Sequence, residues 1–158
     1  MTTPDSSESW IDDIIDAVVS DAQASGYFDK VNIHEPKRKP GTGLTAAVWV
    51  QAMDPLQGAS SLVNTSARVL FLLRIYSNML QEPQDMIDPN MMRAASNLIR
   101  RYHDDFDFAG AIRNVDCLGE FGVALSANAG YLDIDGTMFR VMDISIPCIV
   151  NDVWPQTP

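Results

Sequence analysis

Hydrophobic residues recur every three to four positions near the start of the chain, which predicts an amphipathic helix over residues 9–24. Aspartates fill the opposite side, and the apolar positions are Trp10, Ile11, Ile14, Ile15, Val18, Val19 and Ala22. Ser9 stands where a capping residue belongs, and Gly26 stands where a helix ends.

A second helix is predicted over residues 89–104, with Asp88 as its cap and Pro89 in its first turn. Its apolar stripe consists of Met91, Ala95, Leu98, Ile99 and Tyr102. Most methionines around this helix are expected in the core, but adaptable thioether side chains also suit contact surfaces. The alternative for three of them is therefore an interface role: Met86, Met91 and Met92.

Alternating apolar and polar positions predict five strands, within residues 27–34, 44–53, 61–77, 123–136 and 137–152. The third is unusually long and begins with small polar residues, so we expect it to project beyond its own sheet and seek a neighbouring chain. Asp135 and Gly136 favour a tight hairpin turn between the last two strands. Pro147 cannot donate to a ladder, so its segment should lie at an edge or a bulge.

The predicted order is helix, three strands, helix, two strands. Short turns between strands imply a mainly antiparallel sheet. Both helices must bury their apolar stripes against a face of that sheet. The sequence therefore predicts an α+β fold, a two-layer sandwich in which two amphipathic helices pack on one face of the sheet. Residues 9–153 are expected to form one domain between flexible tails at 1–8 and 154–158.

Charge narrows the possible functions. The chain has 158 residues and a formal net charge of −10, with 21 acidic and 11 basic residues, which argues against a nucleic-acid binder. Cys117 and Cys148 are too few for a disulfide framework, and the polar start does not resemble a signal peptide, so a reducing cytoplasm is expected. The longest apolar stretch is interrupted by Arg74 and is too short to span a membrane.

One basic cluster stands out within the segment HEPKRKPGTG, namely Lys37, Arg38 and Lys39. A phosphate-binding loop places its lysine after the glycines and leads into a helix, whereas here the lysines come first and a strand follows. Two interpretations remain. The segment is a solvated hairpin loop between the first two strands, or it is a contact arm that reaches an acidic patch on a neighbouring subunit.

Candidate catalytic and metal-binding residues are few. His103 and Asp107 have the spacing of a helical ligand pair, but the helix is expected to end there and no second His or Cys group completes a site. No serine or cysteine lies in a strand–elbow–helix motif. The sequence therefore predicts no enzyme, no metal and no cofactor.

Several segments occur in a familiar order. After the acidic helix and the charged loop come TAAVWV, then ARVLFLLRIYSNM, then a helix ending in RRYH, and finally RVMDISIPCIVNDVW. This succession, over about residues 9–153, resembles the tail terminator (tail completion, gpU-like) proteins of long, non-contractile-tailed bacteriophages. The resemblance implies a structural virion protein without catalytic residues. It implies a ring, usually a hexamer, that caps the tail tube, ends its polymerisation and joins it to the head connector.

The partners that the resemblance implies are copies of the chain, the tail tube protein and a head–tail connector or stopper protein. DNA would pass through an acidic lumen without specific binding. The implied location is the head-proximal end of the virion tail, after assembly in the host cytoplasm and without a membrane. From charge and expected exposure we assign the interface to seven basic residues: Lys37, Arg38, Lys39, Arg68, Arg74, Arg100 and Arg101.

Three other functions stay open. The chain could be another neck protein, such as a stopper or an adaptor. It could be a small metal-dependent hydrolase that uses His103 and nearby acids. It could also be a monomeric ligand-binding α+β domain with an apolar cavity. Helix content, divalent-ion binding and oligomeric state distinguish these alternatives.

Overall fold

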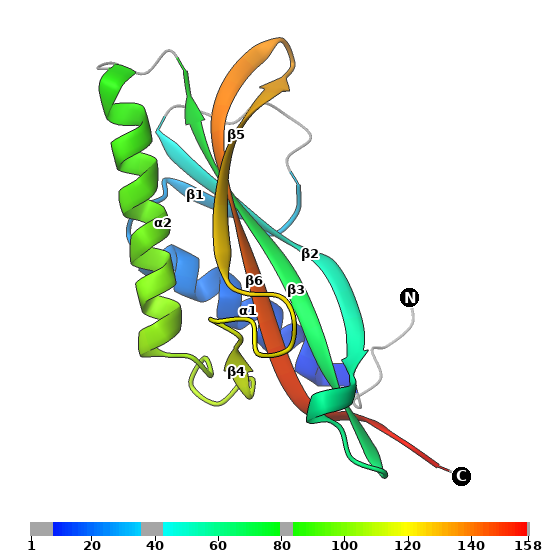
Figure 1. Cartoon of the computed structure of the whole chain (residues 1–158). Helices are drawn as coiled ribbons and strands as arrows, with labels where there is room; N and C mark the ends of the chain where they lie inside the picture. Colours follow the sequence, from blue (N-terminus) through cyan, green and yellow to red (C-terminus); the bar gives the residue numbers. More distant parts are fainter. Residues whose placement is uncertain (1–7, 36–42, 80–83, 158) are drawn as a thin grey trace.

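The computed structural model describes residues 8–35, 43–79 and 84–157 (Figure 1). In chain order its elements are α1 (Ser9–Ala24), β1 (Lys30–Asn32), β2 (Leu44–Leu56), β3 (Asn64–Asn78), α2 (Ile87–Asp104), β4 (Asn114–Val115), β5 (Ser126–Ile134) and β6 (Thr137–Pro155). Short 3-10 turns, η2 (Gln57–Ala59) and η3 (Gln84–Met86), precede β3 and α2. The α+β prediction is confirmed, because two helices accompany a mainly antiparallel six-stranded sheet.

The strand β3 lies at the centre of the sheet, whose order is β1-β2-β3-β6-β4, with β5 also paired to β6. One side of β3 pairs with β2 from Ser66 to Ser77, and the other pairs with β6 from Asn64 to Asn78. The prediction that this 15-residue strand projects beyond its own sheet is therefore wrong. In the described residues β1, β4 and β5 each pair on one side only, and β2 has no partner on its outer side from Val48 to Leu56.

Both helices bury their apolar stripes against the same face of the sheet. The alternating residues Val69, Phe71, Leu73 and Ile75 of β3 form one cluster with Ile14 and Val18 of α1, Met91, Leu98 and Tyr102 of α2, and Ile144 and Ile146 of β6. Fully burying a side chain of this size contributes about 1.5–3 kcal/mol. This shared cluster makes the layers of the sandwich, with α2 and α1 on one side of the twisted strands (Figure 1).

The observed helices lie close to the spans predicted from the apolar period, but the predicted capping residues do not cap them. Helix α1 spans the predicted residues, but Glu8 occupies its N-cap and no side chain caps it, so the capping role predicted for Ser9 is wrong. Helix α2 begins at Ile87, with Asp88 in its first turn instead of at its cap. There the carboxylate of Asp88 accepts hydrogen bonds from Arg140 and faces the positive end of the helix dipole.

The connection between β1 and β2 is not a hairpin. Strand β1 has three residues and runs parallel to β2, with Lys30 opposite Thr45. Strand β2 also continues past its predicted end to Leu56, through a bulge between Val50 and Ala52. Because β1 is short and β2 is long, β1 pairs with only the first part of β2 and leaves the rest of that strand at the edge of the sheet.

Strand β6 is not an edge strand, but Pro147 still lies where a proline is tolerated. The pairing of β5 with β6 ends at Ser145, and the pairing of β4 begins at Cys148. The carbonyl oxygen of Pro147 accepts a hydrogen bond from the amide of Asp116 on that same side. The proline nitrogen therefore faces the junction between two partner strands, where no ladder bond is lost.

The last two strands form the predicted hairpin. Asp135 and Gly136 have φ angles of 52° and 77°, as a two-residue turn with two left-handed positions requires. Strand β6 then continues to Pro155, so residues 154 and 155, expected in the tail, belong to the sheet. The rings of Trp154 and Trp10 pack edge to face, with their centroids 6.4 Å apart.

The other face of the sheet carries a smaller cluster and a loop. Ala47, Tyr76, Phe139 and Val141 are buried there. The loop after β4 is held by the buried carboxylate of Asp116, which accepts the amide hydrogens of Glu120 and Phe121 at 2.8 and 2.9 Å. The described residues contain no helix that is long and apolar enough to cross a membrane.

Replacing Asp116 by alanine should lower the free energy of unfolding by about 1–3 kcal/mol, because two amide groups lose their acceptor. Asp116→Asn keeps one acceptor oxygen and should cost less. Urea denaturation measures both effects, with Glu120→Ala as the control because that side chain is exposed. Equal stability of Asp116→Ala and Glu120→Ala would show that the carboxylate does not hold the loop.

Candidate assembly site

An apolar groove lies between the first turns of α1 and the outer part of β2. Its walls include Trp10, Ile11 and Ile15 on the helix and Val50 and Met53 on the strand, and its volume is about 280 Å³. Val50 and Met53 are 55% and 52% exposed. Exposed apolar surface gathered in one place is typical of a contact site.

The local sequence explains why the groove exists. The apolar stripe of α1 is wider than the part of the sheet that it covers, so Ile11 and Ile15 remain only partly buried. Gln51 is an extra residue between the paired residues Val50 and Ala52, and such a bulge bends the strand beside these isoleucines. Because β1 pairs only with residues 45–47, no described strand pairs with the outer edge of β2 from Val48 to Leu56. Unpaired backbone groups therefore border the apolar side chains.

Two exposed carboxylates follow groove residues along α1. Asp12 and Asp16 directly follow the two isoleucines in the sequence, one helical turn apart, and both are exposed. We refer to the groove with these two aspartates as the α1 groove. It combines an apolar groove with two exposed carboxylates on the same helix turns.

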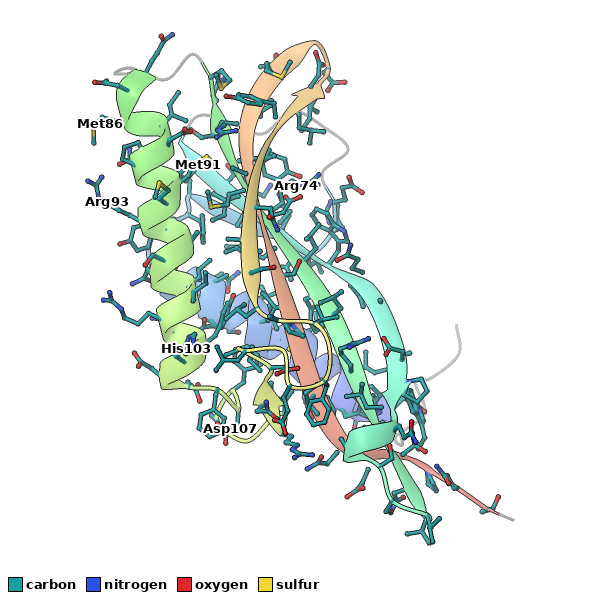
Figure 2. The ribbon with its side chains drawn as sticks, viewed as in Figure 1. Arg74, Met86, Met91, Arg93, His103 and Asp107 are labelled. Carbon is teal, nitrogen blue, oxygen red and sulfur yellow. The ribbon has the colours of Figure 1, made fainter. Side chains whose placement is uncertain are left out.

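The outer face of α2 has the opposite charge. Met92, Arg93, Ser96 and Arg100 are all exposed, and together with Tyr27 they line a shallow hollow of about 370 Å³. Arg93 points away from the sheet (Figure 2). We refer to these residues as the α2 face.

The methionines around α2 divide between the two roles that the sequence left open. Met91 is buried in the core at 1% exposure, whereas Met86 and Met92 are 37% and 61% exposed. Figure 2 shows Met91 directed toward the sheet and Met86 directed away from it. An interface role is therefore compatible with Met86 and Met92 but not with Met91.

The basic residues assigned to the interface have different surroundings. Lys37, Arg38 and Lys39 lie outside the described residues. Arg100 is exposed on the α2 face. The remaining three, Arg68, Arg74 and Arg101, bind carboxylates of their own chain.

These intrachain contacts are specific. Arg68 binds Asp54 at 2.9 Å and donates to the carbonyl oxygen of Phe121. Arg74 makes two hydrogen bonds to Asp143, at 2.6 and 3.0 Å, and these raise the pKa of its guanidinium above the ordinary value. Side-chain exposures of 17% and 16% leave little of either arginine for a partner.

The candidate catalytic residues do not converge. His103 lies on the last turn of α2 and Asp107 on the following loop (Figure 2). The Nδ1 atom of His103 is 2.8 Å from the carbonyl oxygen of Ile99, within its own helix. The part of the chain that the structure describes contains no group of three or more His, Cys, Asp or Glu side chains placed to hold a metal ion.

The two cysteines are free thiols in different settings. Cys148 is fully buried in the core, and burial raises its pKa. Cys117 is partly exposed, and its pKa is raised first by desolvation and then by the charge of Asp116. Neither environment favours the thiolate, which is the reactive form.

No family model matches this chain, and no curated protein matches it.

In the folded protein, a disulfide exchange reagent at about pH 8 should modify Cys117 slowly and leave Cys148 unmodified. Both pKa values are raised, so the thiolate fraction at this pH is smaller than in an unfolded chain and grows as the pH rises. Counting modified thiols before and after addition of urea checks this, with Cys117→Ser as the control. Modification of Cys148 as fast as that of a free thiol in the folded state would contradict the buried position.

Proposed function

We propose that this protein is a structural subunit of a bacteriophage tail. In this proposal, copies of the chain associate into a ring that caps the tail tube, ends its polymerisation and meets the head connector. The observation that carries the proposal is the α1 groove, an exposed apolar surface beside an unpaired strand edge on a chain of net charge −10. Proteins that act alone usually cover or charge such edges, so the groove indicates an assembly contact.

The kind of assembly rests on the resemblance of the chain to tail terminator proteins. Two features of the molecule support it. A groove whose counterpart lies elsewhere on the surface gives a heterologous contact, and such contacts close into rings when the rotation between copies permits. The excess of acidic residues also suits a lumen that DNA crosses without being retained.

A second candidate function is favoured by the same groove. A volume of about 280 Å³ is close to the lower end of the range for small-molecule sites, so a monomeric protein could bind an apolar ligand there. This candidate requires the groove to be open in the working form of the protein. The ring requires it to be covered.

Val50→Glu should prevent assembly without unfolding the protein, because Val50 is more than half exposed and a carboxylate buried at a contact loses its hydration. Sedimentation should find the wild type as a closed oligomer and the variant as a monomer. Leu118→Glu is the matched control, since this leucine is 92% exposed on the loop after β4. An unchanged oligomer for Val50→Glu would contradict the role of the groove.

In a phage that encodes this protein, deleting its gene should yield tail tubes of uncontrolled length in electron micrographs. Wild-type protein and Leu118→Glu should restore tubes of one length, whereas Val50→Glu should not, because it cannot form the cap. Tubes of normal length without the protein would contradict the proposed function.

The ligand-binding alternative makes a different prediction for the monomer. Because Trp10 lines the groove, a bound apolar ligand should change its fluorescence. Titration of wild type and Trp10→Phe with a long-chain fatty acid, as a probe of apolar binding, separates the signal of Trp10 from those of Trp49 and Trp154. Saturable binding to a monomeric wild type would favour this alternative over the ring.

A further inference from the structure

We infer that the α1 groove receives the α2 face of a second copy of this chain, in a head-to-tail contact. Met92 of one copy enters the groove of the next, and Arg93 and Arg100 face the carboxylates of Asp12 and Asp16. This inference rests on the proposed function and names the two surfaces that would join neighbouring subunits.

Charge complementarity is the first argument. The carboxylates of the α1 groove are exposed and lie on consecutive turns of one helix. Arg93 and Arg100 are exposed two turns apart on the other helix, about 10 Å along its axis. Long arginine side chains can close such a difference in spacing, and opposite charges at the margin of a contact set its register.

The availability of these arginines is the second argument. Arg68, Arg74, Arg101 and Arg140 each bind an aspartate of their own chain. Within the described residues no ion pair involves Arg93 or Arg100, and the only side-chain partner seen for Arg93 is the amide oxygen of Asn90, at 3.3 Å. The guanidinium groups of Arg93 and Arg100 are therefore available to an external carboxylate.

The apolar surfaces also match. The side chain of Met92 is 61% exposed and lines the same hollow as the two arginines, and an unbranched thioether adapts to grooves of irregular shape. The α1 groove offers an apolar space of about 280 Å³. Covering both surfaces in one contact removes apolar area from water on each copy.

One copy cannot satisfy this contact internally. Arg101 of α2 binds Asp21 near the C-terminal end of α1, at 2.9 Å, which fixes where the two helices meet. Asp12 precedes Asp21 by nine residues, about 13 Å along the helix, so the acidic first turns lead away from α2. Figure 1 shows α2 on one flank of the molecule and the start of α1 near the other. The two surfaces therefore join different copies.

Two charge-reversal variants test the contact. One carries Asp12→Lys and Asp16→Lys in the groove, and the other carries Arg93→Glu and Arg100→Glu on the α2 face. Each variant alone brings like charges together at every contact, so its dissociation constant should rise about tenfold or more. In an equimolar mixture, contacts alternate between the native pairing and the fully reversed pairing, and both are attractive. Analytical ultracentrifugation at low salt should therefore find assembly restored in the mixture.

Restoration also shows that both variants are folded, and circular dichroism melting curves check this independently. Glu120→Lys is the matched control for an acid-to-lysine change and should assemble as the wild type does. Raising the ionic strength from about 0.05 to 0.5 M should weaken the wild-type oligomer, because salt screens exposed charges.

The possible failures are distinguishable. If the wild type assembles and each variant alone assembles equally well, the contact between α1 and α2 is wrong while the ring stands. If each variant is monomeric and the mixture stays monomeric, the two surfaces do not meet, and the contact is again wrong. If the wild type itself is monomeric at every concentration, self-assembly fails and the proposed function fails with it.

Discussion

The antiparallel pairing of β3 with β6 is the constraint on which the rest of the molecule depends. It extends from Asn64 opposite Pro155 to Asn78 opposite Phe139, with one irregularity between Thr65 and Ala67. Because a shift of one residue would turn every side chain to the other face, this register decides that Val69, Phe71, Leu73 and Ile75 meet both helices. The same register sets Arg74 opposite Asp143 on the opposite face, where the two side chains form an ion pair.

Placing the two longest strands at the centre determines what remains at the margins. The backbone groups of β3 are satisfied on both sides, so the unpaired edges among the described strands lie away from it, on β1, β4, β5 and the outer part of β2. On the β2 side, α1 lies beside the open edge and leaves part of its apolar stripe exposed. The surface proposed for assembly is thus a consequence of how the core is built. It arises where a wide helical stripe extends beyond the partly covered strand.

Much of the fold could be predicted from local pattern. The 3.6-residue period predicted α1 over its observed span, and Asp135 with Gly136 predicted the hairpin turn. The three-residue strand β1 carries too few positions to reveal a parallel pairing.

The polar start of β3 suggested exposure, yet Ser66 is buried. Its hydroxyl group donates to the carbonyl oxygen of Ala59 and accepts from the amide of Asp152. The arginines on β3 were assigned to an interface because their partners are distant in the sequence. Asp143, which binds Arg74, is 69 residues away, and no local pattern links the two. The groove itself depends on how far α1 extends past the sheet, which no sequence period expresses.

The central claim is that the open edge of β2 and the face of α2 become covered when copies of the chain associate. Hydrogen–deuterium exchange, compared between the assembled protein at low salt and the monomer at high salt, tests this most directly. The account predicts slower exchange in the assembly at residues 48–56 and 92–100, with little change in the amides of β3, which are paired in both forms. Equal exchange of those two segments in both forms, or protection confined to other surfaces, would contradict it.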